Sequence, residues 1–211
     1  PVHGKSVVET IQNDVNAIRA AKALPSVNHP NFRWAFTSKE LLEVKDLNLM
    51  EVYNGHPEVN NVGGGGVESL DQMWDILLTA GRRMHGIAVD DAHHFQQWGP
   101  PYSNPGRGWV SVRARELSAE ALVEAIDRGD FYASTGVVLS DVAQEGTTLR
   151  VAIQVNGPLK YTIEFVGEKG RVQKTAPENE ASYTLAAGDR HVRARVTASS
   201  GEMAWTQPLF R

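Results

Sequence analysis

Asp91 and His93 are the residues of this chain whose types and spacing most clearly suggest chemistry. They lie two positions apart, directly after the apolar segment 84–89, which is typical of a buried strand. On an extended backbone alternate side chains point to the same side, so this carboxylate and this imidazole would converge on one point. Such a pair suits zinc, manganese or iron. The spacing predicts part of a divalent-metal hydrolytic site; the competing interpretation is a solvated acidic turn with incidental histidines.

Further candidate residues lie in or after other apolar segments. His29 ends the segment 25–30, where it is either a third ligand or a structural or exposed histidine. Glu51 lies within an apolar run, and a buried carboxylate needs a partner, so we consider a ligand, a general base or a salt bridge. His56 either contacts substrate or is an ordinary loop residue. Asp90 and His94 alternate to the other side of the strand end, where they could orient the ligands.

A repeated helix–strand pattern has to position these side chains. Capping boxes at Ser6, Thr37 and Ser69 predict three helices, of which the third ends at Gly81. Short apolar strands follow them, at 25–30, 48–53 and 84–89. This alternation is typical of a parallel sheet or an α/β barrel, in which ligands gather at the carboxyl ends of the strands. Because three strands are too few to close a barrel, we expect the half that completes it to be missing.

The character of the sequence changes after about residue 137. Before that point, 95–110 is a loop rich in Gly, Pro and aromatic residues, and a strand at 109–112 and a helix from Ser118 to Gly129 are predicted. Beyond it, short alternating strands are expected at 148–155, 159–166, 181–186, 190–198 and 203–206. We therefore expect two domains: 1–136, α/β, and 137–211, a small antiparallel β-sandwich.

The composition narrows the class of protein. The 211 residues carry a net charge of −4 and no cysteine, which gives no indication of a nucleic-acid or membrane partner and excludes thiolate chemistry. Any metal must be held by His and carboxylate. The four glycines at 63–66 lack the Gly-Lys-Ser/Thr of a phosphate loop, and Ser134 lacks the nucleophile-elbow pattern. The chain opens on Pro1 without a targeting signal, so we expect that an N-terminal segment is missing and make no prediction of compartment or oligomeric state.

Several of these motifs resemble those of the polymerase and histidinol phosphatase (PHP) superfamily. The resemblance is carried by Asn-His-Pro-Asn-Phe at 28–32, Glu-Val-Tyr-Asn-Gly-His-Pro at 51–57 and Asp-Asp-Ala-His-His at 90–94. The segments 129–136 and 204–208 are similar to two-domain PHP-like metal-dependent phosphoesterases.

The resemblance implies a fold, a metal site and an activity. It implies the later part of a distorted seven-stranded β/α (TIM-like) barrel that binds two or three zinc, manganese or iron ions when complete. His29 matches the ligand histidine of the fifth strand, and Asp91 and His93 match the ligand pair of the last strand. A metal-activated water would attack phosphorus in a small phosphorylated substrate, with Glu51 and His56 lining the site and His94 or His56 contacting phosphate or moving protons.

The chain also departs from the PHP pattern. The opening His-x-His motif and the other early ligands have no counterpart and would lie before Pro1. We therefore expect the N-terminal part of the same protein to complete the barrel. The alternatives are a non-catalytic truncated barrel joined to a β-sandwich binding or structural module, or the same metal site hydrolysing a different bond.

Overall fold

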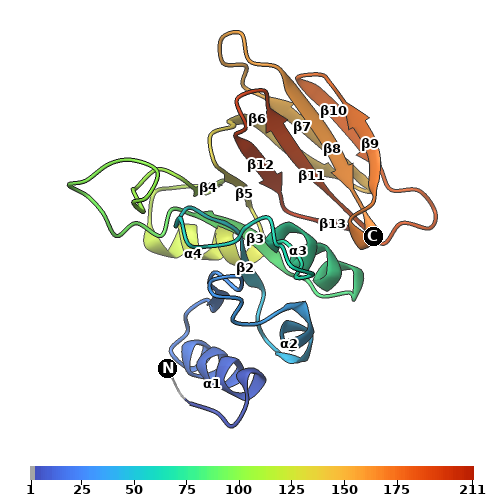
Figure 1. Ribbon diagram of the computed structural model, residues 1–211. Coiled ribbons are helices and arrows are strands. Elements are labelled where there is room, and N and C mark those ends of the chain that lie inside the picture. Colours follow the sequence, from blue (N-terminus) through green and yellow to red (C-terminus); the bar gives the residue numbers. More distant parts are fainter. Residues whose placement is uncertain (1–2) are drawn as a thin grey trace.

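A computed structural model describes residues 3–211 and shows a mixed α/β chain (Figure 1). Its first part is a three-stranded parallel sheet in the order β1-β2-β3. The elements are α1 (Val7–Ala20), β1 (Ser26–Val27), α2 (Ser38–Glu43), β2 (Leu49–Asn54), α3 (Leu70–Thr79) and β3 (His85–Val89). The capping boxes at Thr37 and Ser69 are formed, and Ser6 caps α1 by accepting from the Glu9 backbone N–H.

Helix α3 covers one face of the parallel sheet. Its apolar residues Met73, Trp74, Leu77 and Leu78 are at most 1% exposed, and the Trp74 indole N–H donates to the Met84 carbonyl at 2.8 Å. Gly86 of β3 allows this approach, because a Cβ there would lie 2.9 Å from the Trp74 ring. Met50 and Val52 of β2 belong to the same apolar cluster as these helix residues, so this face of the sheet packs on α3.

The rest of the chain forms two antiparallel sheets. One has the order β10-β7-β6, and the other β4-β5-β12-β11-β8-β9, with β13 pairing β11. Residues such as Leu149, Val151, Ile163 and Phe165 fill the core between them. The elements are β4 (Trp109–Val112), α4 (Ala119–Arg128), β5 (Phe131–Ser134), β6 (Leu139–Glu145), β7 (Thr148–Ile153), β8 (Tyr161–Val166), η1 (Glu168–Gly170), β9 (Val172–Ala176), β10 (Glu180–Thr184), β11 (His191–Ala198), β12 (Met203–Thr206) and β13 (Leu209–Phe210).

The mixed α/β class and most predicted elements are confirmed. The strand predicted at 25–30 is shorter and ends at Val27, because His29 takes a left-handed φ of 30°. Strands β4 and β5 precede residue 137, yet β5 pairs with β12, and β4 pairs with β5, in the large antiparallel sheet. In the described residues the three parallel strands form an open sheet rather than a closed barrel. No helix among them is long and apolar enough to cross a membrane.

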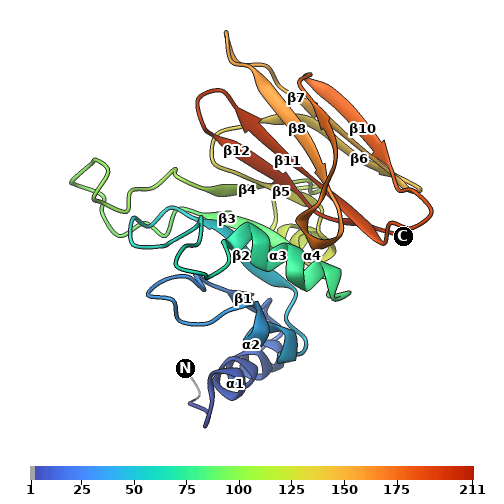
Figure 2. The same cartoon turned by 45° about the vertical axis from the view of Figure 1, so that its right-hand side comes forward.

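The sandwich packs directly on the parallel part. Figures 1 and 2 show α3 between the parallel strands and the sandwich, with α1 and α2 at the far end of the molecule. The contact includes Trp205 of β12, which belongs to the same apolar cluster as Val52 and Trp74. The two parts therefore share a core, so the sandwich can influence the strands that carry the candidate site.

Candidate functional site

The candidate site is organised by Glu51 and Asn54, at the carboxyl end of β2. The Glu51 carboxylate accepts from the His29 backbone N–H at 2.7 Å and from the Asn54 amide at 2.8 Å. The same Asn54 amide nitrogen lies 3.2 Å from an Asp91 carboxylate oxygen. Residues in β2 and residues that follow β1 and β3 are thereby joined in one hydrogen-bonded chain, as expected for the carboxyl edge of such a sheet.

An irregularity in β2 makes this chain possible. Residues three apart on a regular strand point to opposite faces, so Glu51 and Asn54 would not meet. The register between β2 and β3 shifts between Glu51 and Tyr53, which is the signature of a bulge. The extra residue turns Asn54 to the side of Glu51. Both side chains are almost fully buried, at 3% and 0% exposure.

Three imidazoles surround this polar core. The His56 backbone N–H donates to the Asn54 side-chain oxygen at 2.8 Å, and its ring meets the His93 ring edge-on at 5.5 Å between centroids. Phe32 lies between His29 and His56, with its ring centroid 5.4 Å and 6.0 Å from theirs. The structure therefore brings His29, His56 and His93 to one region, with Phe32 as the apolar spacer.

The geometry expected for Asp91 and His93 is wrong. Asp91 has a φ of 48°, so the backbone is not extended there and the two side chains do not simply alternate. The His93 Nδ1 lies 2.7 Å from the Asp91 carbonyl oxygen and 3.8 Å from its carboxylate. Because a carbonyl oxygen only accepts, this contact uses Nδ1 as a donor, and it leaves Nε2 free of it on a ring whose side chain is 62% exposed.

Burial controls the protonation of Glu51. Desolvation raises the pKa of this carboxyl above its ordinary value, and the nearby Asp91 charge acts in the same direction. The hydrogen bonds from Asn54 and from the His29 backbone oppose the shift without cancelling it. Glu51 is thus a buried carboxyl that takes up a proton more readily than an exposed one, a property expected of proton-transfer groups as well as of structural ones.

His94 and Asp90 have different partners from those expected. Asp90 accepts from the Gly106 backbone N–H at 2.8 Å, and the His94 Nδ1 contacts the Ser103 hydroxyl at 3.2 Å. The His94 ring packs on Tyr102, with 5.1 Å between centroids. Both residues hold the loop between β3 and β4 in shape, and the structure does not bring His94 to Glu51 and Asn54.

Asn54 is the residue of the site that the sequence interpretation missed. It follows the predicted strand 48–53 and has no role among the predicted site residues, although an amide beside buried apolar residues is itself a signal, because its hydrogen bonds must be met inside the protein. Its backbone is also held: its N–H donates to the Asn61 side-chain oxygen at 2.9 Å, and its carbonyl accepts from the Asn61 amide at 2.8 Å. Gly55 then lets Arg107 approach, since a Cβ at Gly55 would lie 2.6 Å from that of Arg107.

The cluster is not a preassembled metal site. Within residues 3–211 no group of three or more His, Asp or Glu side chains is arranged to hold a metal ion. The predicted ligands His29, Asp91 and His93 share a region, but their donor atoms do not form a closed ligand set. The described residues provide the carboxylate of Asp91, the exposed imidazole of His93 and the buried carboxyl of Glu51, grouped around the amide of Asn54.

Comparisons with known proteins do not assign a family. No protein-family model and no curated protein matches the chain. Among solved structures, it was aligned with the Clostridium perfringens spore cortex lytic enzyme SleM at 11% identity and a TM-score of 0.25, over 97% of this chain and 76% of that one. This likeness is too weak to indicate a common fold or activity.

Proposed function

We propose that the Glu51–Asn54–Asp91 cluster, with His29, His56 and His93, is part of a divalent-metal site that hydrolyses a small phosphorylated substrate. The observation that supports it is the hydrogen-bonded chain joining the ends of three parallel strands. The proposal includes the finer fold interpretation, that the open sheet is the later part of a TIM-like barrel of the PHP type.

Backbone strain at the proposed ligands supports a functional role. His29 and Asp91 both have positive φ, at 30° and 48°, a conformation that non-glycine residues adopt at a cost of about 1–3 kcal/mol. Such strain persists where the surroundings impose it. Positive φ also occurs at Lys22, Arg33, Trp34, Asp46 and Lys169, so the support comes from the contacts that impose it at the site. Here the imposing contacts are those of the cluster itself, since Glu51 holds the His29 backbone and Asn54 holds the Asp91 carboxylate.

Each residue has a role in the proposal. Asp91, His93 and His29 are donors for zinc, manganese or iron, which would supply a water of lowered pKa. Glu51 and His56 hold protons or contact phosphate beside that water. His94 is retained only as the residue that shapes the loop carrying Asp91 and His93. The missing ligands would come from the N-terminal part of the same protein, which would also complete the barrel.

The lack of a closed ligand set in the described residues favours a second candidate function. In it, the chain is a non-catalytic binding or structural module, and the buried polar cluster only fixes the fold. A site of the same kind that cuts another bond is a variant of the first proposal, because the metal–water chemistry is shared.

Metal binding and turnover separate these candidates. We would measure Mn²⁺ and Zn²⁺ binding by calorimetry, and hydrolysis of a panel of phosphomonoesters and phosphodiesters, for this chain and for one that includes the residues encoded upstream. Asp91→Asn and His93→Ala should weaken metal binding about tenfold or more. Asp130→Asn is the matched control, because Asp130 pairs with Arg128 on the surface. Absence of metal binding and turnover in the extended chain would exclude the hydrolase and leave the structural module.

A further inference from the structure

We propose that Trp205 and Gln207 of the sandwich are positioning residues for the candidate site: they set β2 and β3 so that Asn54 reaches both Glu51 and Asp91. The significance for catalysis rests on the proposed function, but the positioning itself does not. Trp205 lies in β12 and Gln207 directly follows it, and both side chains contact the parallel sheet, at Tyr53 and at Gly86. The side chain of Thr206 between them instead accepts from the Ala194 backbone N–H within the sandwich.

Trp205 acts on β2. Its ring stacks on Tyr53, with 6.2 Å between centroids and 28° between planes, and it is 3% exposed. Tyr53 lies where the β2 register shifts and directly precedes Asn54. Tyr53 also meets Gly108, where a Cβ would lie 3.0 Å from the tyrosine ring. Held by these two contacts, the Tyr53 ring fixes the backbone at the bulge that turns Asn54 toward Glu51.

Gln207 acts on β3. Its side-chain oxygen accepts from the Gly86 backbone N–H, and its side-chain nitrogen donates to the Gly86 carbonyl, both at 2.9 Å. Gly86 lies on the edge of β3 that faces away from β2, where these groups have no strand partner in the parallel sheet. The 2%-exposed glutamine amide thus replaces a strand neighbour at this position. This contact fixes β3, and Asp91 lies just after the end of that strand.

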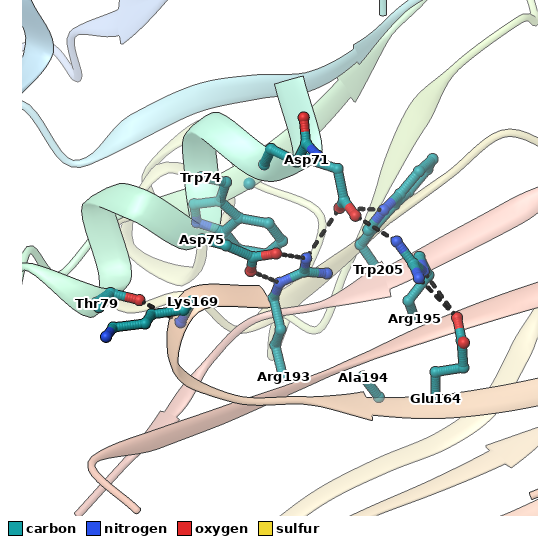
Figure 3. A network of polar contacts seen from close by, with 12 residues as sticks. Asp71, Trp74, Asp75, Thr79, Glu164, Lys169, Arg193, Ala194, Arg195 and Trp205 are labelled. Carbon is teal, nitrogen blue, oxygen red and sulfur yellow. Dashed lines mark hydrogen bonds and ion pairs between the residues drawn. The ribbon is translucent and has the colours of Figure 1, made fainter. Parts of the chain in front are cut away.

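The orientation of Trp205 is in turn fixed by charge. Its indole N–H donates to the Asp71 carboxylate at 3.0 Å (Figure 3). That carboxylate also pairs with Arg193 at 3.0 Å and with Arg195 at 2.5 Å. Burial raises the pKa of Asp71, but the two guanidinium groups outweigh it and hold that pKa below its ordinary value. Asp71 therefore ionises more readily than an exposed aspartate, which favours the charged acceptor that orients Trp205.

Amide hydrogen exchange tests the positioning role without requiring metal. The Gly55 N–H donates to the Val89 carbonyl at 2.9 Å, and the His56 N–H donates to the Asn54 side chain at 2.8 Å, so these two amides report on the joint between β2, β3 and Asn54. We expect Trp205→Leu and Gln207→Ala to accelerate exchange at both amides about tenfold or more. Trp205→Phe, which keeps a stacking ring but loses the bond to Asp71, should give an intermediate acceleration.

The matched control is Phe165→Leu, a core substitution in the sandwich at a residue that is 0% exposed and stacks on Tyr183 instead. When the variants are compared at the same free energy of unfolding, Phe165→Leu should leave the Gly55 and His56 amides protected from exchange. Equal acceleration by Phe165→Leu, or unchanged protection in both Trp205→Leu and Gln207→Ala, overturns the proposal. If Trp205→Leu does not fold, Gln207→Ala and Trp205→Phe decide the question by the same criterion.

A Mn²⁺ titration of the same variants separates this inference from the proposed function. If the wild-type protein binds Mn²⁺ and the Trp205 and Gln207 variants bind it equally, with both amides still protected, the positioning role is wrong and the metal site stands. If the wild-type protein extended upstream binds no Mn²⁺ but the variants lose protection, the metal site is wrong and the positioning role stands.

Discussion

The guanidinium of Arg193, on β11 of the sandwich, forms two parallel hydrogen bonds with the carboxylate of Asp75 on α3, at 2.8 and 2.9 Å. Arg193 is 0% exposed, and its guanidinium lies 4.7 Å from the centre of the Trp74 ring. Gly170, with a φ of 68°, allows η1 to pass beside the pair, since a Cβ there would lie 2.8 Å from an Asp75 oxygen. The sandwich and α3 are therefore joined by a buried, bidentate ion pair.

Arg193→Met should lower the free energy of unfolding by about 3–5 kcal/mol, because it leaves the Asp75 carboxylate buried without its cation. Urea denaturation measures the change. Arg150→Met is the control: Arg150 pairs with Asp141 and Glu180 at the surface, and its loss should have little effect. The double substitution Arg193→Met/Asp75→Leu should recover part of the loss, because both buried charges are then gone. If Arg193→Met and Arg150→Met lowered the free energy of unfolding equally, the result would contradict a stabilising role for the buried pair.

Asn54→Ala should destabilise the protein by about 2–4 kcal/mol, because it removes the partner of two carboxylates and of the His56 N–H in a buried place. Denaturation by urea checks the magnitude. Asn60→Ala is a suitable comparison, since the Asn60 amide donates to the Asn31 carbonyl at 3.2 Å in a less buried position. A loss no larger than that of Asn60→Ala would show that the cluster does not depend on Asn54.

Glu51→Gln should leave the stability at neutral pH unchanged or increased, because glutamine can accept the same two hydrogen bonds without a buried charge. The raised pKa of Glu51 means that the folded state holds the proton more tightly than the unfolded state. Wild-type stability therefore declines as the pH rises from the ordinary Glu value of 4.5 through the raised one.

Denaturation at two pH values tests whether Glu51 causes this decline in stability. The advantage of Glu51→Gln over the wild-type protein should be greater at about pH 8 than at about pH 4.5, measured by urea denaturation at both. If the proposed function is right, the same variant loses activity while it keeps its stability. An advantage that does not depend on pH would mean that Glu51 keeps its ordinary pKa in the fold.

His191 should make the sandwich sensitive to acid. The ring is 1% exposed, packs on Phe210 at 5.8 Å between centroids, and has no hydrogen-bond partner for either nitrogen in the described part of the chain. Burial lowers its pKa; Arg193 and Arg190 act in the same direction, and Glu168 opposes them.

The unfolded state therefore binds more protons than the folded state once the pH falls below the ordinary His value of 6.5. Stability is present above 6.5 and is lost as the pH falls through the lowered pKa. His191→Phe should flatten this fall in thermal denaturation profiles between about pH 7 and about pH 5. Burial also lowers the pKa of His85. This residue should account for the loss of stability in acid that remains in His191→Phe. His3→Phe at an exposed position is the control, and an equal flattening by it would exclude His191 as the source.

The chain's local patterns predicted its elements well. Ser69 with Gln72 and Thr37 with Glu40 form the capping boxes that their spacing indicates, and Gly129 ends α4 in the left-handed conformation. These features depend on contacts within about four residues, which are visible in the order of the amino acids. For the same reason the apolar runs gave the parallel strands, and with them the edge at which His29, Glu51 and Asp91 gather.

The details of the candidate site could not be predicted from the order of the amino acids. The bulge in β2, the central amide of Asn54 and the left-handed turn at Asp91 all depend on partners that are distant in sequence. An alternating pattern fixes which face a residue takes only while the strand is regular, and one extra residue reverses it. This is why the extended geometry assumed for Asp91 and His93 was wrong although their general location was right.

By itself, the sequence determined the mixed α/β class, the caps and the strand ends at which candidate residues collect. Only the tertiary structure decided that β4 and β5 join the antiparallel sheet, that His94 shapes a loop, and that Trp205 and Gln207 contact the parallel strands. The physical reason is range: helix caps and strand periodicity are local, whereas stacking, buried ion pairs and edge hydrogen bonds join residues more than a hundred positions apart.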